Sequence, residues 1–304
     1  PTWAQVGSGG EHAAINSRPV ISFTLALNYA LGALDPFGYH LFNLLVHIGC
    51  AVLAFGLLRR TLRMPVVGLC FAPRADVLAF FTALLWLVHP IGTECVNYIV
   101  QRTEGLMSFF YLAVFYCLCR THNSDDRRWP WLAIASCALG MASKEVMVTA
   151  PFMAALYMRV FLVDSLSELG RKYGILLAGL AVSWVGLAFL LWNTPHGTTI
   201  GFAHGIDAWT YALNQCIAIV RYLQLSFWPR HLALDYGFPK ALVFADIWPY
   251  AFVVCLLLCS AIWFGRKRLT LLFCGAWIFV ILAPTSSFVP IVNQVAAERR
   301  MYLP

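Results

Sequence analysis

The sequence predicts an all-α, polytopic membrane protein. Of its 304 residues 61% are hydrophobic and only 12% are charged, whereas a soluble domain carries roughly 25% charged residues. The apolar residues form long continuous stretches and lack the alternating pattern of a membrane β-barrel. These observations exclude a soluble enzyme, a nucleic-acid-binding domain, a disordered chain and a small disulfide scaffold.

Hydropathy divides the chain into an exposed outer segment, 1–18, and a single membrane domain, 19–304. Residues 19–34 are apolar but too few to cross a bilayer easily, so we expect an interfacial or re-entrant helix there. The turn Asp35-Pro36-Phe37-Gly38 ends it. About eight membrane spans follow, at residues 39–60, 75–89, 104–119, 130–143, 146–163, 173–192, 247–264 and 269–291.

The basic residues predict the orientation. The loops 59–74, 120–128, 159–172 and 266–268 hold 13 of the 21 Lys and Arg residues, which places these loops in the cytoplasm. The span at 173–192 then exits outward and the span at 247–264 must run inward. The amphipathic segment 209–228 therefore cannot cross once, and we expect an interfacial or re-entrant helix on the outer side.

Three polar residues of the first span, His40, Asn43 and His47, share one helix face at spacing i, i+3, i+7. Polar groups at membrane depth face a wet cavity or a neighbouring helix. The stripe therefore predicts a cavity that contacts a polar substrate or, alternatively, hydrogen bonds between helices. No third ligand is evident, so we expect no metal site.

A polar loop, 89–104, connects the second and third spans and contains Glu94, Gln101, Arg102 and Glu104. Glu104 is expected in the first turn of the third span, where it would favour the helix N-terminus. Arg102 lies just outside an apolar helix, where a guanidinium suits a phosphate at the membrane surface. We expect Glu94, Gln101 and Glu104 to line the same outer cavity.

Two further cations are candidates for phosphate binding. Lys144 separates two short apolar helices and contacts a phosphate or simply a helix C-terminus. Arg221 is a lone cation on the amphipathic face of 209–228 and suits an anion. In the outer loops, Asp235 is a candidate base or a turn residue, and residues 298–302 read as a solvated or interfacial segment. An enzyme built from these residues would draw an anionic, lipid-linked substrate from the bilayer and needs no cofactor.

Five segments, in this order, resemble the membrane core of the tetratricopeptide-repeat O-mannosyltransferase family, which belongs to the GT-C glycosyltransferases. They are Arg18-Pro19 leading into LALNYALGALDPFGYHLFNLLVH, HPIGTECVNYIVQRTEGL, GMASKEVMVTAP, RYLQLSFWP followed by LDY, and PTSSFVPI through AERRMYLP. The resemblance extends over residues 18–304. It implies a GT-C-like helical bundle in which the first span and the C-terminal repeats of the family are lacking.

The resemblance also implies a function. Such enzymes move a mannose-like sugar from a polyprenyl-phosphate carrier to a protein hydroxyl on the periplasmic or lumenal face. It implies membrane lipids, the carrier and an acceptor protein as partners. The expected location is the bacterial inner membrane, or the endoplasmic reticulum in a eukaryote. Arg102, Lys144 and Arg221 match family positions and fit the phosphate-binding role.

The family's catalytic base precedes the Arg-Pro motif, and only seventeen residues precede Arg18. We therefore assign the base to no residue and expect it upstream of this chain. The alternative hypothesis is a non-catalytic membrane subunit that keeps a GT-C-like fold and packs against other membrane subunits. No nucleic acid is expected as a partner.

Overall fold

The computed structural model of the chain is all-α, as the sequence predicts. It describes residues 18–68, 70–192, 208–233, 236–237, 242, 244–286 and 295–304. The expected outer segment 1–18 therefore lies outside the described residues except for Arg18, and so does the candidate base Asp235. Within the described ranges the secondary structure consists of α-helices and short 3₁₀ helices.

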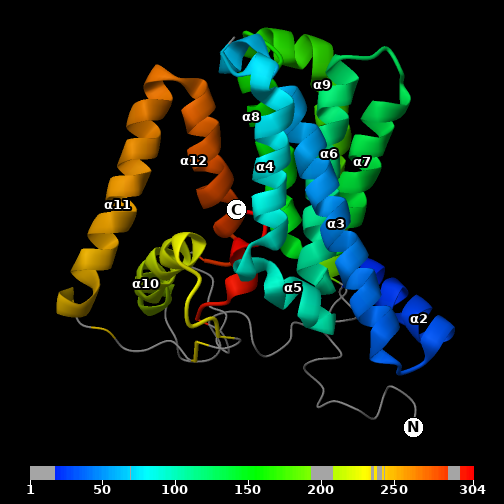
Figure 1. Cartoon of the computed structure of the whole chain (residues 1–304). Coiled ribbons are helices and arrows are strands. Elements are labelled where there is room, and N and C mark those ends of the chain that lie inside the picture. The colour runs from blue at the N-terminus through cyan, green and yellow to red at the C-terminus, as the bar shows by residue number, and fades with distance from the viewer. Residues whose placement is uncertain are drawn as a thin grey trace.

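The upright helices stand side by side and roughly parallel (Figure 1). They are α3 (Pro36–Thr61), α4 (Ala75–Val88), α6 (Arg102–His122), α7 (Arg128–Met141), α8 (Ala150–Phe161), α9 (Leu166–Trp192), α11 (Phe244–Lys267) and α12 (Leu269–Leu282). Each one overlaps one predicted span. At α3 a local signal explains where the helix begins: the side chain of Asp35 accepts a hydrogen bond from the Phe37 N–H, and Pro36 follows Asp35.

Only some of the upright helices in the described residues are long and apolar enough to cross a membrane alone. In the described part of the chain, three helices are long and apolar enough to cross alone: Pro36–Thr61, Leu166–Trp192 and Ala245–Lys267. A fourth crossing is possible if Ala72–Val88 and Pro90–Asn97, which meet at a bend of 53°, form one span. Helices as short as α12, about 21 Å long, do not reach across a hydrocarbon layer of about 30 Å. The expected count of eight spans stays a prediction.

Three expected elements differ in detail. The span at 146–163 is interrupted: a 3₁₀ helix, η6 (Glu145–Thr149), precedes α8. The span at 269–291 ends at Leu282, before the turn that contains Pro284, and residues 287–291 lie outside the description. The polar loop at 89–104 is helical, with η4 (Pro90–Gly92), α5 (Thr93–Asn97) and η5 (Ile99–Gln101). Pro90 starts this run because its fixed φ suits a helix N-terminus.

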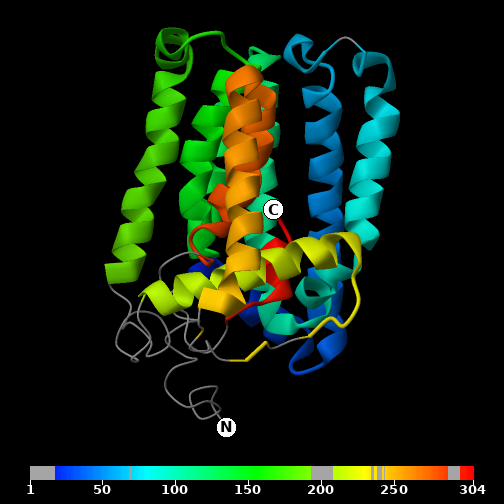
Figure 2. The same cartoon turned by 90° about the vertical axis from the view of Figure 1, so that its left-hand side faces the viewer.

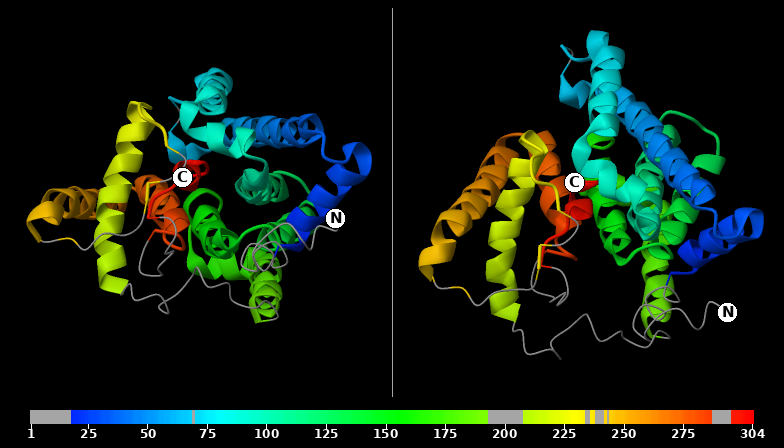
Figure 3. Two further views of the ribbon diagram at one scale, coloured as in Figure 1. Left: turned by 90° about the horizontal axis from the view of Figure 1, so that it is seen from below. Right: turned by 60° about the horizontal axis from the view of Figure 1, so that its bottom comes forward.

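The molecule has two different ends. The connections with many basic residues, which were expected in the cytoplasm, all lie at the upper end in Figure 1. The lower end carries α2 (Pro19–Gly32), α5 and α10 (Ala208–Phe227), and α10 lies across the upright helices there (Figure 2). Seen from below, α2 and α10 flank this end on opposite sides (Figure 3). The upright helices thus alternate in direction as the orientation argument requires.

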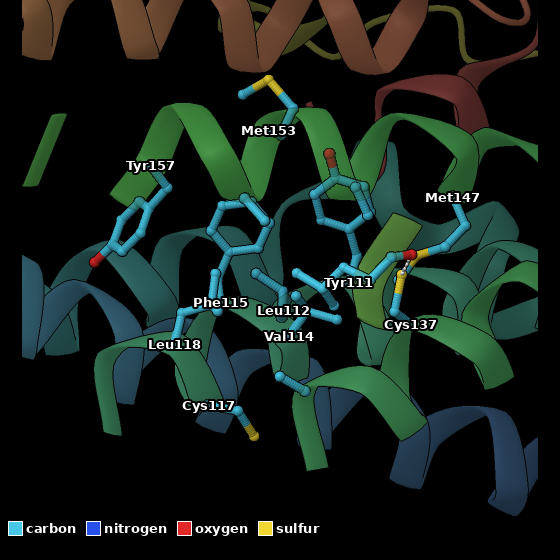
Figure 4. Close-up of a cluster of buried hydrophobic side chains, with 14 of the residues drawn as sticks. Tyr111, Leu112, Val114, Phe115, Cys117, Leu118, Cys137, Met147, Met153 and Tyr157 are labelled. Atoms are coloured by element: carbon cyan, nitrogen blue, oxygen red, sulfur yellow. Dashed lines mark hydrogen bonds between the residues drawn. The ribbon is translucent and has the colours of Figure 1, made fainter. Parts of the chain in front are cut away.

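The core lies between α6, α7, α8 and α12 (Figure 4). The rings of Tyr111 and Phe115 stack with centroids 5.4 Å apart, and Trp277 of α12 meets Phe115 edge-on at 5.2 Å. Tyr157 of α8 is buried, and its hydroxyl lies 2.7 Å from Thr61 Oγ1 and 2.9 Å from Cys119 Sγ. The aromatic rings thus join α6 to α12, and the hydroxyl of Tyr157 joins α8 to α3 and α6.

Candidate functional site

Buried charge is concentrated where the lower ends of the helices meet the last described segment. Among the residues that the structure describes, five charged ones are at most 6% exposed: Glu94, Arg102, Glu104, Glu298 and Arg300. All of them belong to α5, to the first turn of α6 or to η8 (Glu298–Met301). Burying a charge in a membrane protein is expensive, so such groups are functional-site candidates by default. Their partners decide what they can do.

The first pair joins two of the predicted site residues. The ammonium of Lys144, which precedes η6, donates to Glu104 Oε2 in the first turn of α6. The two side chains are 11% and 4% exposed. Glu104 lies in the first turn of α6, as predicted. In addition to the helix N-terminus, it has the ammonium of Lys144 as a partner. The positive charge of Lys144 is therefore already balanced within the protein.

The second pair brings together residues far apart in the sequence. Arg299 donates from its guanidinium to one carboxylate oxygen of Glu94 and from its backbone N–H to the other, the latter at 3.1 Å. Glu94 is 4% exposed and Arg299 is 12% exposed as side chains. The segment 298–302, expected to be solvated or interfacial, is thus packed into the bundle. This expectation is wrong because Glu94 offers a buried carboxylate that no neighbour in sequence balances.

The polar stripe on α3 divides between two environments. Nδ1 of His47 lies 2.7 Å from the Tyr302 hydroxyl, and its Nε2 lies 2.9 Å from the carbonyl of Leu87. Asn43 is buried and donates to the carbonyl of Val96 at 3.3 Å. His40 is exposed. The interhelical hydrogen bonds are therefore present, and the cavity-lining role of the stripe stays a prediction, as it does for the half-buried Gln101.

Arg102 was expected in a loop. In the structure it is the first residue of α6, and it is only 1% exposed. Its Nη1 donates to Asn28 Oδ1 at 2.7 Å and its Nη2 to the carbonyl of Tyr39 at 3.4 Å. The guanidinium carbon lies 4.6 Å from the centre of the Phe42 ring, a cation–π contact. Protein groups of α2 and α3 hold Arg102, and its phosphate-binding role stays a prediction.

Arg221 lies on the other side of the same end, on α10. Its Nη2 donates to the carbonyls of Arg230 and His231, both at 3.3 Å. Its neighbour Tyr222 is buried and accepts a hydrogen bond from the Ala297 N–H at 2.8 Å. Arg221 is half-buried. The three cations predicted from the sequence therefore have three separate sets of protein partners.

Glu298 fastens the loop after α10 to the last segment. Its Oε1 accepts from the Ala233 N–H and from the Tyr236 hydroxyl, each at 2.6 Å. Burial, followed by this hydrogen bond to a carboxylate, raises the pKa of Tyr236 to about 12. Tyr236 therefore stays protonated and donating at neutral pH. Glu298, Arg299 and Arg300 were missed as site residues, although a run of three charges within a family-like segment was a usable signal.

An apolar groove adjoins this network. It lies between α10, α11 and α12, has a volume of about 260 Å³, and is lined almost entirely by apolar side chains, with Tyr222 and Met301 on its α10 side. No group of three or more His, Cys, Asp or Glu residues in the described ranges is placed to hold a metal ion. The chemistry available at this end is therefore that of arginines, a lysine and carboxylates beside an apolar groove.

Comparison with known proteins finds several similar proteins with one shared name. The chain is 29% identical to the human protein O-mannosyl-transferase TMTC4 over 94% of this chain and 45% of that protein. The chain is related to the protein O-mannosyl-transferases. Tmtc3 of Drosophila melanogaster is 34% identical over 50% of this chain and 18% of its own length, and mouse TMTC2 is 33% identical over 46% and 16%. The predicted resemblance is confirmed.

The match covers only part of the human relative. The chain spans about 45% of the length of the human relative that it matches almost throughout. No protein-family model matches the chain. No solved structure matches it.

Proposed function

We propose that this chain is the membrane core of a protein O-mannosyl-transferase. It moves a mannose-like sugar from a polyprenyl-phosphate carrier to a hydroxyl group of a protein. The observation that carries this proposal is the 94% coverage of the chain by a relative with that printed name. The relatives reported above are animal proteins, which favours the lumenal face of the endoplasmic reticulum over the bacterial inner membrane.

The cations at the lower end of the bundle support this proposal. The bond between sugar and phosphate breaks as the acceptor oxygen attacks, and negative charge develops on the departing phosphate. Fixed cations stabilise that charge best where little reorganisation is needed. Arg221 of α10 and Arg300 of η8 supply such cations. Each is next in sequence to a residue that lines the apolar groove, Tyr222 and Met301. A carboxylate must take the proton of the acceptor hydroxyl, and we assign that base to no described residue.

The alternative function is a non-catalytic subunit that keeps this fold. One observation favours it: Glu104 balances Lys144, and Glu94 balances Arg299. Internal pairing of this kind suits a structural role. The alternative predicts a protein that binds other membrane subunits and transfers no sugar.

A transfer assay separates the two functions. The full-length protein in lipid nanodiscs is given polyprenyl-phosphate mannose with a radioactive sugar and a Ser- and Thr-rich acceptor domain. We expect label on the acceptor, and less of it with Arg221→Gln than with Arg171→Gln, a matched control at an exposed arginine of α9. A folded protein that binds the carrier but transfers no label to any acceptor hydroxyl would overturn the proposed function.

A further inference from the structure

The outward face of α4 is apolar and is left uncovered by the described part of the chain. Residues 77–88 contain no charged side chain. Seven of the large apolar side chains there are at least 38% exposed: Val77, Leu78, Phe80, Phe81, Leu84, Leu85 and Val88. The helix stands upright in Figure 1 and lies at the edge of the molecule when seen from below in Figure 3. This surface therefore meets either lipid or a further protein segment.

The inward face of α4 favours lipid as the occupant of the outward face. Three alanines at spacing i, i+4, i+8 share the inward face: Ala75 and Ala79 are fully buried, and Ala83 is 5% exposed. α4 packs chiefly on α3, and small residues let membrane helices approach each other closely. The small side of α4 is thus already used for a helix contact. The bulky side that remains suits fluid hydrocarbon chains.

A charged cluster marks the upper limit of this lipid-facing surface. Asp76, the residue before Val77, forms ion pairs with Arg59 and Arg63. The side chain of Asp76 is 52% exposed, and those of the two arginines are 40% and 46% exposed. Charged groups so exposed lie in water or among lipid headgroups, because hydrocarbon does not solvate them. The hydrocarbon layer therefore begins at about the level of Val77.

A bend and polar side chains mark the lower limit. Where α4 ends, the chain turns by 53°, and α5 then exposes Thr93 and Asn97. At this turn, Nε2 of His89 lies 3.1 Å from the carbonyl oxygen of Ser226, near the end of α10. Trp228 follows and is 64% exposed, and tryptophan is typical of the interface between membrane and water. The hydrocarbon layer therefore ends near His89.

The lipid-facing surface of α4 is much shorter than a bilayer is thick. From Val77 to Val88 it measures about 17 Å at 1.5 Å per residue, against a hydrocarbon thickness of about 30 Å. On α9 the exposed apolar surface runs from Ile175 to Trp192, about 26 Å by the same rise. A short span is accommodated by bilayer thinning, by flanking cations that extend to the headgroups, or by contact with further helices. Residues 89–98 contain no Lys or Arg and the bulky face disfavours a helix contact, which leaves thinning.

We propose that the bilayer is locally thinned where it meets α4. Below this helix, α5 holds the buried pair of Glu94 and Arg299 (Figure 1). Water therefore reaches deeper on this side, close to a polar network that a bilayer of full thickness would cover. The thinning does not depend on the proposed function, because a non-catalytic subunit with this fold would thin the bilayer in the same way. If the chain transfers sugar, the thinned side is the one from which a water-soluble acceptor approaches.

Electron cryomicroscopy in nanodiscs measures the thinning directly. The full-length protein is reconstituted in dioleoylphosphatidylcholine, and the distance between the two phosphate layers is compared beside α4 and beside α9. We expect the layers to be closer beside α4 by about 9 Å, the difference between the two apolar lengths. Equal spacing on both sides would overturn the inference. An ordered helix lying on α4 would also overturn it, because a further protein segment would then cover this face. Neither result bears on whether the chain transfers sugar.

Matched variants test the cause of the thinning. Thr93→Leu/Asn97→Leu extends the exposed apolar surface below α4 and should move the nearby phosphate layer away from the bilayer centre. Val185→Leu exchanges one apolar residue for another in the middle of the α9 surface, where Val185 is 69% exposed, and should move neither layer. A double variant that folds and leaves the spacing beside α4 unchanged would contradict the proposal.

Lipid crosslinking tests the wild type without any substitution. Nanodiscs contain equal amounts of two phosphatidylcholines with a diazirine in the chain, one with myristoleoyl and one with longer oleoyl chains. After irradiation, lipid adducts on each peptide are counted by mass spectrometry. Peptides of α4 should carry a higher ratio of short to long lipid than peptides of α9. The same ratio on both helices would mean that α4 meets a bilayer of ordinary thickness, and the proposal would be wrong.

Discussion

Replacing Lys144 with methionine should destabilise the fold, whatever Lys144 contributes to substrate binding. The substitution leaves Glu104, whose side chain is 4% exposed, without its cation. Breaking a buried ion pair from one side costs about 3–5 kcal/mol, and the N-terminus of α6 offsets about 1 kcal/mol for an acid in its first turn. We expect a net loss of about 2–4 kcal/mol. At roughly 2–4 °C per kcal/mol, the melting temperature in detergent should fall several degrees.

The double variant Lys144→Met/Glu104→Gln completes the test. It removes both charges, so most of the lost stability should return. Thermal unfolding followed by size-exclusion chromatography of the wild type, the two single variants Lys144→Met and Glu104→Gln, and the double variant gives the coupling between the two residues. A single Lys144→Met variant as stable as the wild type, or a double variant no better than the single, would refute the reasoning. A stable double variant that has lost carrier binding, together with a Glu104→Gln variant that keeps it, would assign Lys144 the phosphate contact predicted from the sequence.

Three further changes have defined outcomes. Arg102→Ala empties a site that is 1% exposed and should cost about 3 kcal/mol, as large buried truncations do; its melting temperature checks this. Gly275→Ala should destabilise because the new Cβ meets α11, whereas Gly186→Ala, with open space around it, should be neutral or gain up to about 1 kcal/mol of helix propensity. Burial has the largest single effect on the pKa of Glu145 and raises it, but Arg18, a backbone hydrogen bond and Lys144 together outweigh burial, and the pKa is lowered. The ion pair between Arg18 and Glu145 therefore stabilises the fold above about pH 4.5, and its contribution is lost as the pH falls through the lowered pKa of Glu145. The difference in melting temperature between the wild type and Glu145→Gln should therefore shrink from pH 6 to pH 3.

The helices could be predicted because their signals are local. Apolar length sets each upright helix, and the Asp35-Pro36 turn marks the start of α3 by a cap that the structure contains. The short helix α5 could not be predicted in this way. It has five residues, and its stability comes from tertiary contacts such as that of Glu94 with Arg299. A sequence window cannot contain a partner 205 positions away.

The position of the polar end could be predicted, but the pairing of its charges could not. Arg102 looks solitary in the sequence and so suggests a ligand, yet the fold brings Asn28 to it from 74 positions away. Arg299 looks solvated and is buried against Glu94. In a membrane protein a lone charge in the sequence is thus equally consistent with a distant protein partner and with a substrate. Loss of activity in a single variant does not separate the two, because both kinds of charge are needed. Removing the charge together with its internal partner does separate them, since only a substrate contact is still missed once the fold has recovered.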